Sequence, residues 1–223
     1  MHASLQDKVV LVTGAAGGIG RAIAERFANQ GSLVVVNDID ADAAGAVVES
    51  IVASGGRASA AIADVSNGGQ VAEMFETVMA AHGTVDVLVN NAGFEVQGAL
   101  EMIDDELMHR QLDTNVLGPL RMIRSVMPAW RERGHGVVVN VSSVVGRATS
   151  PFGGAYAASK HALEAMSEAL HWEASSAGIR VRLIEPGRFP ATDFGSNIVR
   201  PDGWEGSAFE AKTLSLREAL SSL

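Results

Sequence analysis

The sequence predicts an α/β fold in a single domain over residues 1–223, with a doubly wound parallel sheet between two layers of helices. Three observations predict it. Short runs rich in β-branched residues alternate with longer stretches that have helical periodicity. The first of these runs is continuously apolar and the second has the same character, which is typical of strands buried on both faces. The unusual glycine-rich and polar motifs follow the ends of these runs, where parallel sheets bind their ligands.

Six segments have the character of buried strands. Five are dominated by Val, Leu and Ile, whereas the third is rich in Ala and is followed by Asp64. In chain order they are Val9–Val12, Leu33–Val36, Ala58–Ala63, Val85–Val89, Val137–Val141 and Ile179–Ile184. Because helical stretches separate them, we expect right-handed crossovers between parallel strands.

The helical stretches show apolar residues on one face and polar residues on the other. They are Arg21–Asn29, Asp40–Ala53, Gln70–Ala81, Asp104–Arg133 and Ala155–Ala177. The fourth begins with an acidic run that favours a helix N-terminus, and we expect an interruption near Gly118-Pro119. After Gly195 the sequence shows no further buried strand, and residues 190–223 are expected to form a substrate-side loop and tail.

Composition excludes several classes of protein. The chain has 17 Lys and Arg against 26 Asp and Glu, and the resulting net charge of −9 disfavours binding to nucleic acid or an anionic membrane. It has no cysteine, and its six histidines lack ligand spacing, so we expect neither a disulfide nor a metal site. No apolar segment is long enough for a signal peptide or a membrane helix, and the expected location is cytoplasmic.

A glycine-rich turn, Thr13-Gly14-Ala15-Ala16-Gly17-Gly18-Ile19-Gly20, follows the first strand and precedes a helix. Glycine lets the backbone turn tightly and lets a phosphate approach without meeting a Cβ. The helix N-terminus offers free N–H groups and a partial positive charge. A plain strand-to-helix turn is the alternative, but this context favours dinucleotide binding.

An acidic residue ends the second strand. Asp38 lies 18 residues beyond Gly20, where a carboxylate commonly accepts hydrogen bonds from an adenosine ribose. The 2′-phosphate of NADP(H) would meet this carboxylate as a like charge, at a cost of up to ~4 kcal/mol per unit charge at a separation of about 4 Å. The pattern therefore favours NAD(H). The alternative is that Asp38 caps the following helix.

A tyrosine, a lysine and a serine are spaced for proton transfer. Tyr156, the only tyrosine, and Lys160 share one face at the start of a predicted helix. Ser143 lies just past the fifth strand, and Asn115 lies in the long helical stretch. An ammonium stabilises a phenolate, so the tyrosine could exchange a proton with an alcohol or ketone oxygen that the serine holds. Taken alone, such a Tyr–Lys pair more often lines an exposed helix.

Together these motifs resemble the short-chain dehydrogenase/reductase family, in its single-domain branch. The resemblance runs from about Lys8 to Thr192 and implies a Rossmann-like fold. The motifs that carry it, in family order, are TGAAGGIG (13–20), Asp38, Asp64-Val65, NNAG (90–93), Asn115, Ser143, Tyr156-x-x-x-Lys160 and Pro186-Gly187.

The resemblance implies a role for each matching position. Tyr156 would be the general acid/base, and Ser143 would anchor the substrate oxygen. Lys160 would bind the nicotinamide ribose and lower the pKa of Tyr156, while Asn115 would support a water that relays protons. The implied cofactor-binding positions are Gly14, Gly18, Ile19, Gly20, Asp38, Asp64, Val65, Asn91, Ala92, Gly93, Tyr156, Lys160, Pro186, Gly187 and Phe189.

The sequence departs from the family pattern in two places. The segment from Pro186 to Thr192 is one residue longer than the usual Pro-Gly-x-x-x-Thr, which puts a contact of Thr192 with the cofactor in doubt. The family usually adds a last helix and a seventh strand, and the sequence shows no obvious counterpart. This member is therefore expected to be either short or incomplete.

The sequence thus predicts an NAD(H)-dependent oxidoreductase that interconverts a secondary alcohol and a ketone. An apolar lining would favour a hydrophobic substrate, and its expected members are Phe94, Val96, Val144, Val145, Phe152, Phe194 and Trp204. Arg147 and Arg188 would qualify this by meeting a carboxylate or an acyl carrier, unless both lie on the solvated surface. One alternative function is an NADP(H)-dependent 3-oxoacyl reductase. A second is a dinucleotide-binding sensor without turnover. The resemblance also implies a homodimer or homotetramer.

Overall fold

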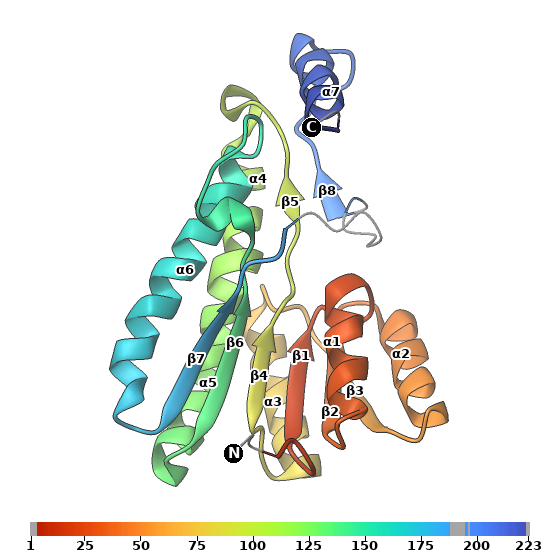
Figure 1. Ribbon diagram of the computed structural model, residues 1–223, viewed down its shortest axis with the longest axis vertical. Coiled ribbons are helices and arrows are strands. Elements are labelled where there is room, and N and C mark those ends of the chain that lie inside the picture. The colour runs from red at the N-terminus through yellow and green to blue at the C-terminus, as the bar shows by residue number, and fades with distance from the viewer. Residues whose placement is uncertain (1–3, 188–194, 196, 222–223) are drawn as a thin grey trace.

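A six-stranded parallel sheet forms the centre of the molecule (Figure 1). The computed structural model describes residues 4–187, 195 and 197–221. The strand order is β3-β2-β1-β4-β6-β7, and every neighbouring pair is parallel. The strands are β1 (Val9–Thr13), β2 (Leu33–Asp38), β3 (Arg57–Ile62), β4 (Val87–Asn90), β6 (Gly136–Val141) and β7 (Ile179–Ile184). The predicted fold class and all six predicted strands are confirmed.

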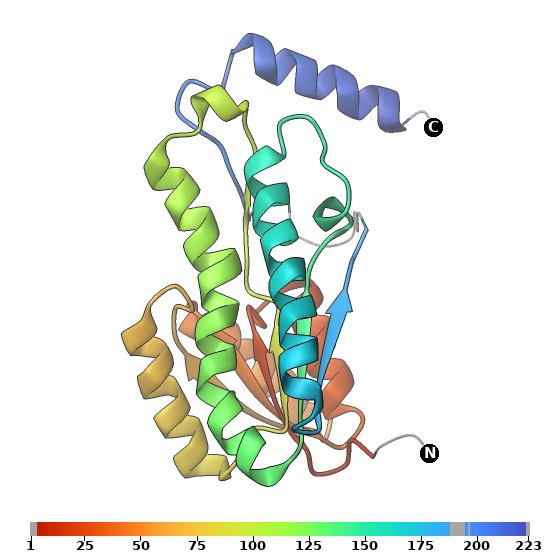
Figure 2. The same ribbon diagram turned by 90° about the vertical axis from the view of Figure 1, so that its left-hand side faces the viewer.

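Helices cover both faces of the sheet (Figure 2). Helices α1 and α2 pack on one face, whereas α3, α5 and α6 pack on the other. The helices are α1 (Gly18–Ala28), α2 (Ala41–Ala53), α3 (Gly68–His82), α4 (Asp105–Leu112), α5 (Gly118–Arg133), α6 (Gly154–Ser175) and α7 (Ala208–Ser221). In the part of the chain that the structure describes, no helix is both long and apolar enough to cross a membrane.

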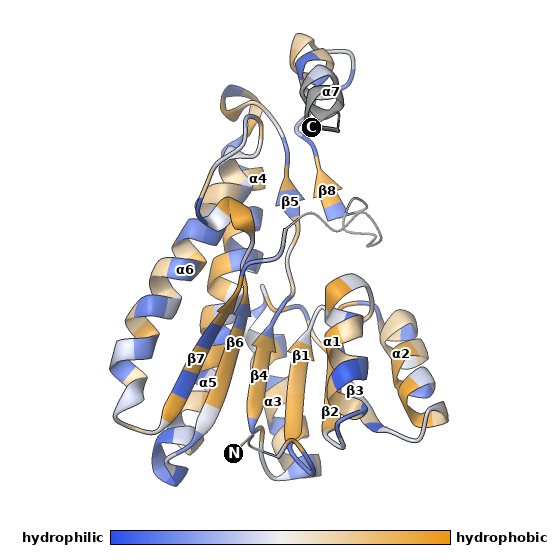
Figure 3. Ribbon diagram, in the orientation of Figure 1, coloured by the Kyte–Doolittle hydropathy of each residue, from blue (hydrophilic) through white to orange (hydrophobic). Residues whose placement is uncertain are grey.

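The central strands β1 and β4 are buried on both faces, which explains their continuous apolar runs. Successive side chains of a strand point to opposite faces. Val10 and Val12 of β1 therefore pack under α1 and α2, while Val9 and Leu11 pack under α3 and α5. Figure 3 shows the resulting hydrophobic character along β1 and β4.

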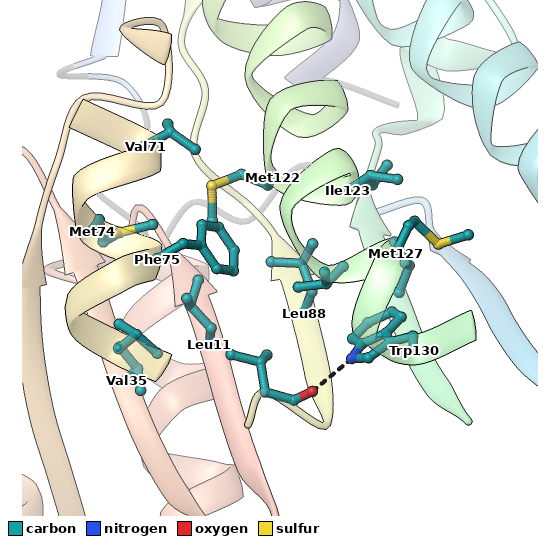
Figure 4. Close-up of a cluster of buried hydrophobic side chains, with 14 of the residues drawn as sticks. Leu11, Val35, Val71, Met74, Phe75, Leu88, Met122, Ile123, Met127 and Trp130 are labelled. Carbon is teal, nitrogen blue, oxygen red and sulfur yellow. Dashed lines mark hydrogen bonds between the residues drawn. The ribbon is translucent and has the colours of Figure 1, made fainter. Parts of the chain in front are cut away.

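The larger core cluster lies between the sheet and helices α3 and α5 (Figure 4). Phe75 of α3 and Met122 of α5 meet Leu11 and Leu88 of the sheet in this cluster. Trp130 at the end of α5 is almost fully buried, and its indole Nε1 donates a hydrogen bond of 2.6 Å to the carbonyl oxygen of Val85. Apolar contacts and one polar anchor thus fix α5 against the bottom of β4.

The long helical stretch predicted over residues 104–133 is broken earlier than expected. The side chain of Asp104 caps α4 by accepting a hydrogen bond from the Leu107 N–H, as the acidic run predicted. The break is a π-helical turn, η2 (Asp113–Leu117), which lies just before the expected interruption at Gly118-Pro119. Pro119 occupies the first turn of α5, where its missing N–H costs no hydrogen bond. Such π-helical turns occur frequently at functional sites.

A small second sheet was not predicted. Strand β5 (Glu95–Val96) pairs in parallel with β8 (Ile198–Val199), and each is only two residues long. Strands this short carry no recognisable periodicity. Two single 3₁₀ turns, η1 (Leu100–Met102) and η3 (Val144–Gly146), also lie in loops. The described residues after Gly195 add no strand to the main sheet.

The strand order opens a crevice at one end of the sheet. From β1 the chain proceeds outward through β2 to β3, then returns to the other side of β1 and proceeds through β4 and β6 to β7. The crossovers after β1 and β4 therefore leave in opposite directions. A ligand crevice forms at such a reversal point, beyond the carboxyl ends of the strands.

The packing of Trp130 predicts the effect of one added methyl group. A Cβ at Gly136 would lie only 2.1 Å from the Trp130 ring, so Gly136→Ala should lower the free energy of unfolding by about 1–3 kcal/mol. Gly45→Ala is the matched control, because Gly45 lies inside α2 and its added Cβ would meet nothing within 4 Å. That change should raise stability by about 0.5–1 kcal/mol. Urea denaturation measures both, and equal effects would contradict the packing.

Candidate functional site

One large cleft lies at the carboxyl end of the sheet, with a volume of about 1180 Å³. The structure brings most of the predicted site residues into it. The predicted residues that line it are Gly14, Gly18, Ile19, Asp38, Asp64, Val65, Asn91, Ala92, Gly93, Ser143, Tyr156, Lys160, Pro186 and Gly187. Gly20 and Asn115 do not line it, and Phe189 and Thr192 lie outside the described residues.

The glycine-rich turn is shaped by close backbone contacts on one side and open space on the other. Gly14 has a φ of +60°, and a Cβ there would lie 2.8 Å from the Cα of Ala92. A Cβ at Gly20 would lie 2.1 Å from the carbonyl oxygen of Gly14, so Gly20 keeps the turn tight without facing the cleft. A Cβ at Gly17 or Gly18 would meet nothing within 4 Å.

The start of α1 fits an anionic ligand. Gly17 is its N-cap, and no side chain caps the helix. The first-turn N–H groups and the partial positive charge at this end are therefore available to an anion such as a pyrophosphate. Together with the open space above Gly17 and Gly18, this arrangement fits the phosphate groups of a dinucleotide.

Hydrogen bonds from the end of β4 hold the turn in place. The Nδ2 of Asn91 donates to the carbonyl oxygens of Thr13 and Gly14, both at 2.9 Å. The hydroxyl of Thr13 accepts hydrogen bonds from the backbone N–H groups of Asn91 and Ala92, both at 3.0 Å. The ends of β1 and β4 are thus tied together at the reversal point of the sheet.

Asp38 lies at the edge of the cleft and does not cap α2. Its carboxylate accepts hydrogen bonds from the N–H groups of Ala16, at 3.0 Å, and Ile39, at 2.8 Å. Asp40 is the N-cap, with its side chain accepting from the Ala43 N–H. The alternative reading of Asp38 as a helix cap is therefore wrong. A carboxylate has about four acceptor positions, so Asp38 keeps capacity for a further donor.

The carboxylate of Asp64 shapes the loop after β3. It accepts hydrogen bonds from the backbone N–H of Ser66, at 2.8 Å, and from its hydroxyl, at 2.7 Å. The N–H of Asp64 donates to the side-chain oxygen of Gln70 at the start of α3. These contacts place Asp64 and Val65 along the same wall of the cleft as Asp38.

Tyr156, Lys160 and Ser143 meet on the opposite wall. The side chain of Tyr156 is hydrogen-bonded to that of Ser143. The ammonium of Lys160 lies 5.6 Å from the centre of the Tyr156 ring and donates a hydrogen bond of 2.8 Å to the carbonyl oxygen of Val141. Tyr156 is 8% exposed and Lys160 is 4% exposed, so both groups are almost dry.

Burial changes the acidity of both groups. It raises the pKa of Tyr156 above its ordinary value, with a further rise from the negative charge of Glu95, and the hydrogen bond with Ser143 offsets this only in part. It lowers the pKa of Lys160 to about 8, against an opposing effect of Glu164. The resemblance implied a lowered pKa for Tyr156. Desolvation of the phenolate acts in the opposite direction, and the lowering by Lys160 together with an oxidised nicotinamide stays a prediction.

Asn115 braces the site from below. It lies in the π-helical turn η2, and its Nδ2 donates to the carbonyl oxygen of Phe94, at 3.0 Å, and to the hydroxyl of Ser159, at 3.1 Å. Its Oδ1 accepts from the Phe94 N–H, and a Cβ at Gly93 would lie 2.9 Å from that oxygen. The side chain therefore joins the loop after β4 to α6, and its implied role toward a relay water stays a prediction.

The substrate side of the cleft is more polar than the sequence predicted. Phe94, Val144, Val145 and Phe152 line it as expected. Val96 and Trp204 do not, because both are buried in the core, where the Trp204 ring packs against Phe152. Phe194 and Arg188 lie outside the described residues. The polar lining residues that the sequence did not single out are Glu95, Gln97, Arg110, Ser150, Asn197 and Arg200.

A buried charged group behind the cleft was also missed. Glu164 of α6 accepts a hydrogen bond of 2.7 Å from the Ser142 hydroxyl and pairs with Arg147. Its position four residues after Lys160 was the only signal in the sequence, and charged residues at that spacing usually lie on a solvated face. Among the described residues, no group of three or more His, Asp or Glu side chains could hold a metal ion.

Comparison with known proteins agrees with this geometry. A family model described as short chain dehydrogenase matches residues 8–202. A 3-ketodihydrosphingosine reductase from Bacteroides thetaiotaomicron is 35% identical over 185 residues, which cover 83% of this chain. A short-chain dehydrogenase from Streptomyces avermitilis has a TM-score of 0.86 at 37% identity, over 97% of this chain and 79% of that one.

A metagenomic short-chain oxidoreductase in complex with NADP has a TM-score of 0.80 at 35% identity, over 83% of this chain and 85% of that one. The chain spans 65% of the length of the Bacteroides reductase. It spans 55% of two uncharacterized oxidoreductases from Schizosaccharomyces pombe. The family match, together with the parallel sheet and the cleft that holds the predicted site residues, leads to one conclusion: the chain belongs to the short-chain dehydrogenase family of oxidoreductases.

Proposed function

We propose that this chain is an NAD(H)-dependent oxidoreductase that interconverts a secondary alcohol and a ketone, with Tyr156 as the general acid/base. One observation carries the proposal. The hydrogen-bonded hydroxyls of Tyr156 and Ser143 and the buried ammonium of Lys160 share a cleft with the glycine-rich turn. Proton transfer and dinucleotide binding therefore have residues of the right chemistry within one site.

The residues that would hold the cofactor lie along the cleft in a fixed order. The glycine-rich turn and the start of α1 would bind the pyrophosphate, and Asp38 the adenosine ribose. Asp64 and Val65 would meet the adenine, and Asn91, Ala92 and Gly93 would border the adenosine side. Lys160, Pro186, Gly187 and Phe189 would border the nicotinamide end. When bound, a nicotinamide dinucleotide supplies the acceptor or donor of the hydride.

In the direction of ketone reduction, the phenol of Tyr156 gives its proton to the carbonyl oxygen as negative charge develops there. The hydroxyl of Ser143 donates a hydrogen bond to the same oxygen and holds it in place. The ammonium of Lys160 stabilises the phenolate that remains. In alcohol oxidation the same phenolate accepts the hydroxyl proton. Burial raises the pKa of Tyr156, so its phenol is protonated at neutral pH and is available as the acid in ketone reduction.

The choice of NAD(H) rests on Asp38. Its carboxylate is fixed by the Ala16 and Ile39 N–H groups at the edge of the cleft. The described lining residues around it include Asn37, Asp40 and Ala43 but no Lys or Arg that could neutralise a 2′-phosphate. NADP(H) is the second candidate, because the metagenomic relative was solved in complex with NADP. A 3-oxoacyl reductase would be the corresponding alternative function.

The lining supports a substrate with an apolar body and a polar group. Phe94, Val144, Val145 and Phe152 surround the reacting end with apolar and aromatic surface. Glu95, whose negative charge acts on Tyr156, and Arg200 supply charge to the lining. The Bacteroides relative is named as a reductase of 3-ketodihydrosphingosine, which supports a ketone as the substrate class. A homodimer or homotetramer and a cytoplasmic location stay predictions.

Replacing Tyr156 with Phe removes only the hydroxyl that would carry the proton. Turnover of a ketone panel with NADH should fall by a factor of 10² or more, on the order of a general acid/base contribution. Binding of NADH, followed by its fluorescence, should be retained. Unchanged turnover in Tyr156→Phe would refute the assignment of this residue.

Replacing Asp38 with Ser tests the cofactor preference. The wild type should bind NADH more tightly than NADPH, and Asp38→Ser should raise the affinity for NADPH relative to NADH by about 10-fold or more, since a like-charge contact is removed. Asp42→Asn is the matched control, because Asp42 is exposed in the first turn of α2 and does not line the cleft. Fluorescence titration of both cofactors decides, and a wild type that prefers NADPH would overturn the choice.

Ketone reduction should lose rate as the pH rises through about 8, because the buried ammonium of Lys160 is lost there. The phenol of Tyr156 stays protonated in this range, since its pKa is raised. A profile of kcat/KM from about pH 6 to about pH 10 should fall on its alkaline side. Lys160→Arg keeps its charge throughout and should remove this fall. A wild-type profile that is flat to high pH would contradict the role of the ammonium.

A further inference from the structure

A buried acid lies behind the catalytic wall of the cleft. Glu164 is on α6, one turn after Lys160, and is only 7% exposed. It is not among the lining residues of the cleft, so it would not touch substrate or cofactor. A buried carboxylate is costly unless it is paired and hydrogen-bonded, and its contacts therefore indicate what it does.

The two oxygens of Glu164 hold the loop that carries Ser143. Its Oε1 accepts a hydrogen bond of 2.7 Å from the Ser142 hydroxyl, and its Oε2 lies 2.8 Å from the Nε of Arg147. A Cβ at Gly146 would lie 2.1 Å from Oε1, so only glycine lets the loop approach this closely. Ser143 is therefore flanked on both sides by residues that bind the same carboxylate.

Arg147 extends the link to the loop after β7. Its Nε and Nη2 donate to Oε1 of Glu185 at 3.1 and 3.0 Å, directly before Pro186-Gly187. The backbone adds two bonds in the same direction, from the Ser142 N–H to Ile184, at 2.7 Å, and from the Val144 N–H to Pro186, at 3.1 Å. The loops after β6 and β7, which border the proposed nicotinamide end, are thus joined to each other and to α6.

The charge of Glu164 also acts on Lys160. The two side chains lie one helical turn apart, and the negative charge opposes the loss of the buried ammonium. The charged groups that act on Glu164 are Lys160 of α6 and Arg147, which directly follows η3. Glu168 of the next turn and Glu185 of the loop after β7 act on Arg147 in turn. Glu164 thus pairs with Arg147 and lies one helical turn from Lys160.

We propose that Glu164 is a positioning residue, whose carboxylate fixes the Ser143 loop against α6 and places a negative charge one helical turn from the Lys160 ammonium. The proposal rests on the proposed function, because it assigns Glu164 to the machinery of Ser143, Tyr156 and Lys160. It acts through these residues and makes no contact with the reacting atoms.

The variant Glu164→Gln tests the charge while retaining the shape and an acceptor for the Ser142 hydroxyl. We expect kcat for ketone reduction to fall by on the order of 10- to 100-fold, with the alkaline limb of the pH profile moved down by about one pH unit. The matched control is Glu168→Gln, an exposed carboxylate one turn later on the same helix, which should change neither. A kcat and profile equal to those of the control would overturn the proposal.

The titration of Lys160 gives a readout that does not depend on turnover. The chain has three lysines, Lys8, Lys160 and Lys212, so NMR with labelled lysine side chains resolves them. We expect the wild-type Lys160 to titrate near pH 8 and to titrate lower in Glu164→Gln but not in Glu168→Gln. An unshifted Lys160 in Glu164→Gln would overturn the proposal.

A second variant covers the case in which Glu164→Gln folds poorly. Arg147 is exposed, and Arg147→Ala cuts the link to Glu185 without removing the buried acid. In Arg147→Ala we expect kcat to fall while the pKa of Lys160 does not fall. A kcat equal to that of the wild type would overturn the role of Glu164 in holding the loops together. If the wild type shows no turnover on any ketone or alcohol, the proposed function fails, whereas the Lys160 titration still reports whether Glu164 sustains the ammonium.

Discussion

The burial of the Lys160 ammonium constrains the half of the cleft that carries Tyr156 and Ser143. Lys160 is enclosed between α6 and the end of β6, where its Nζ donates to the carbonyl oxygen of Val141. A dry cation is stable only beside fixed dipoles and opposite charge. Glu164 supplies the charge from the next turn, and the Val141 carbonyl supplies the dipole. The helix that carries Tyr156 is therefore held to the strand that leads into Ser143.

A second constraint acts on the other half of the cleft. There the side chains of Thr13 and Asn91 tie the ends of β1 and β4 together by four hydrogen bonds. These hydrogen bonds fix the glycine-rich turn at the point where the strand order reverses. The half of the cleft at the glycine-rich turn is held by hydrogen bonds between neutral groups, whereas the half at Tyr156 is held by a buried charge. Both meet in one cleft because all six strands are parallel and end at the same edge.

Much of the fold could be predicted from local patterns, and most of the candidate site was implied by the resemblance to a known family. Continuous apolar runs predicted the central strands, because strands buried on both faces leave no polar alternation. The edge strands are different, since β7 alternates buried residues with the exposed Arg180 and Arg182, and β3 is partly exposed along its length. The polar motifs followed strand ends, and a parallel sheet brings such ends together. Two features could not be predicted in this way. The strands β5 and β8 are too short for any period, and the acidity of Tyr156 depends on burial that residue spacing does not encode.

The sequence by itself determined the order of strands and helices, the glycine positions that the tight turn requires, and the residue types available for proton transfer. Only the tertiary structure decided that Val96 and Trp204 are core residues and that Asp40 rather than Asp38 caps α2. It also decided that Glu164 is buried and pairs with Arg147. The physical reason is that burial and pairing depend on which distant segments pack together, and spacing along one helix or strand carries no record of its neighbours.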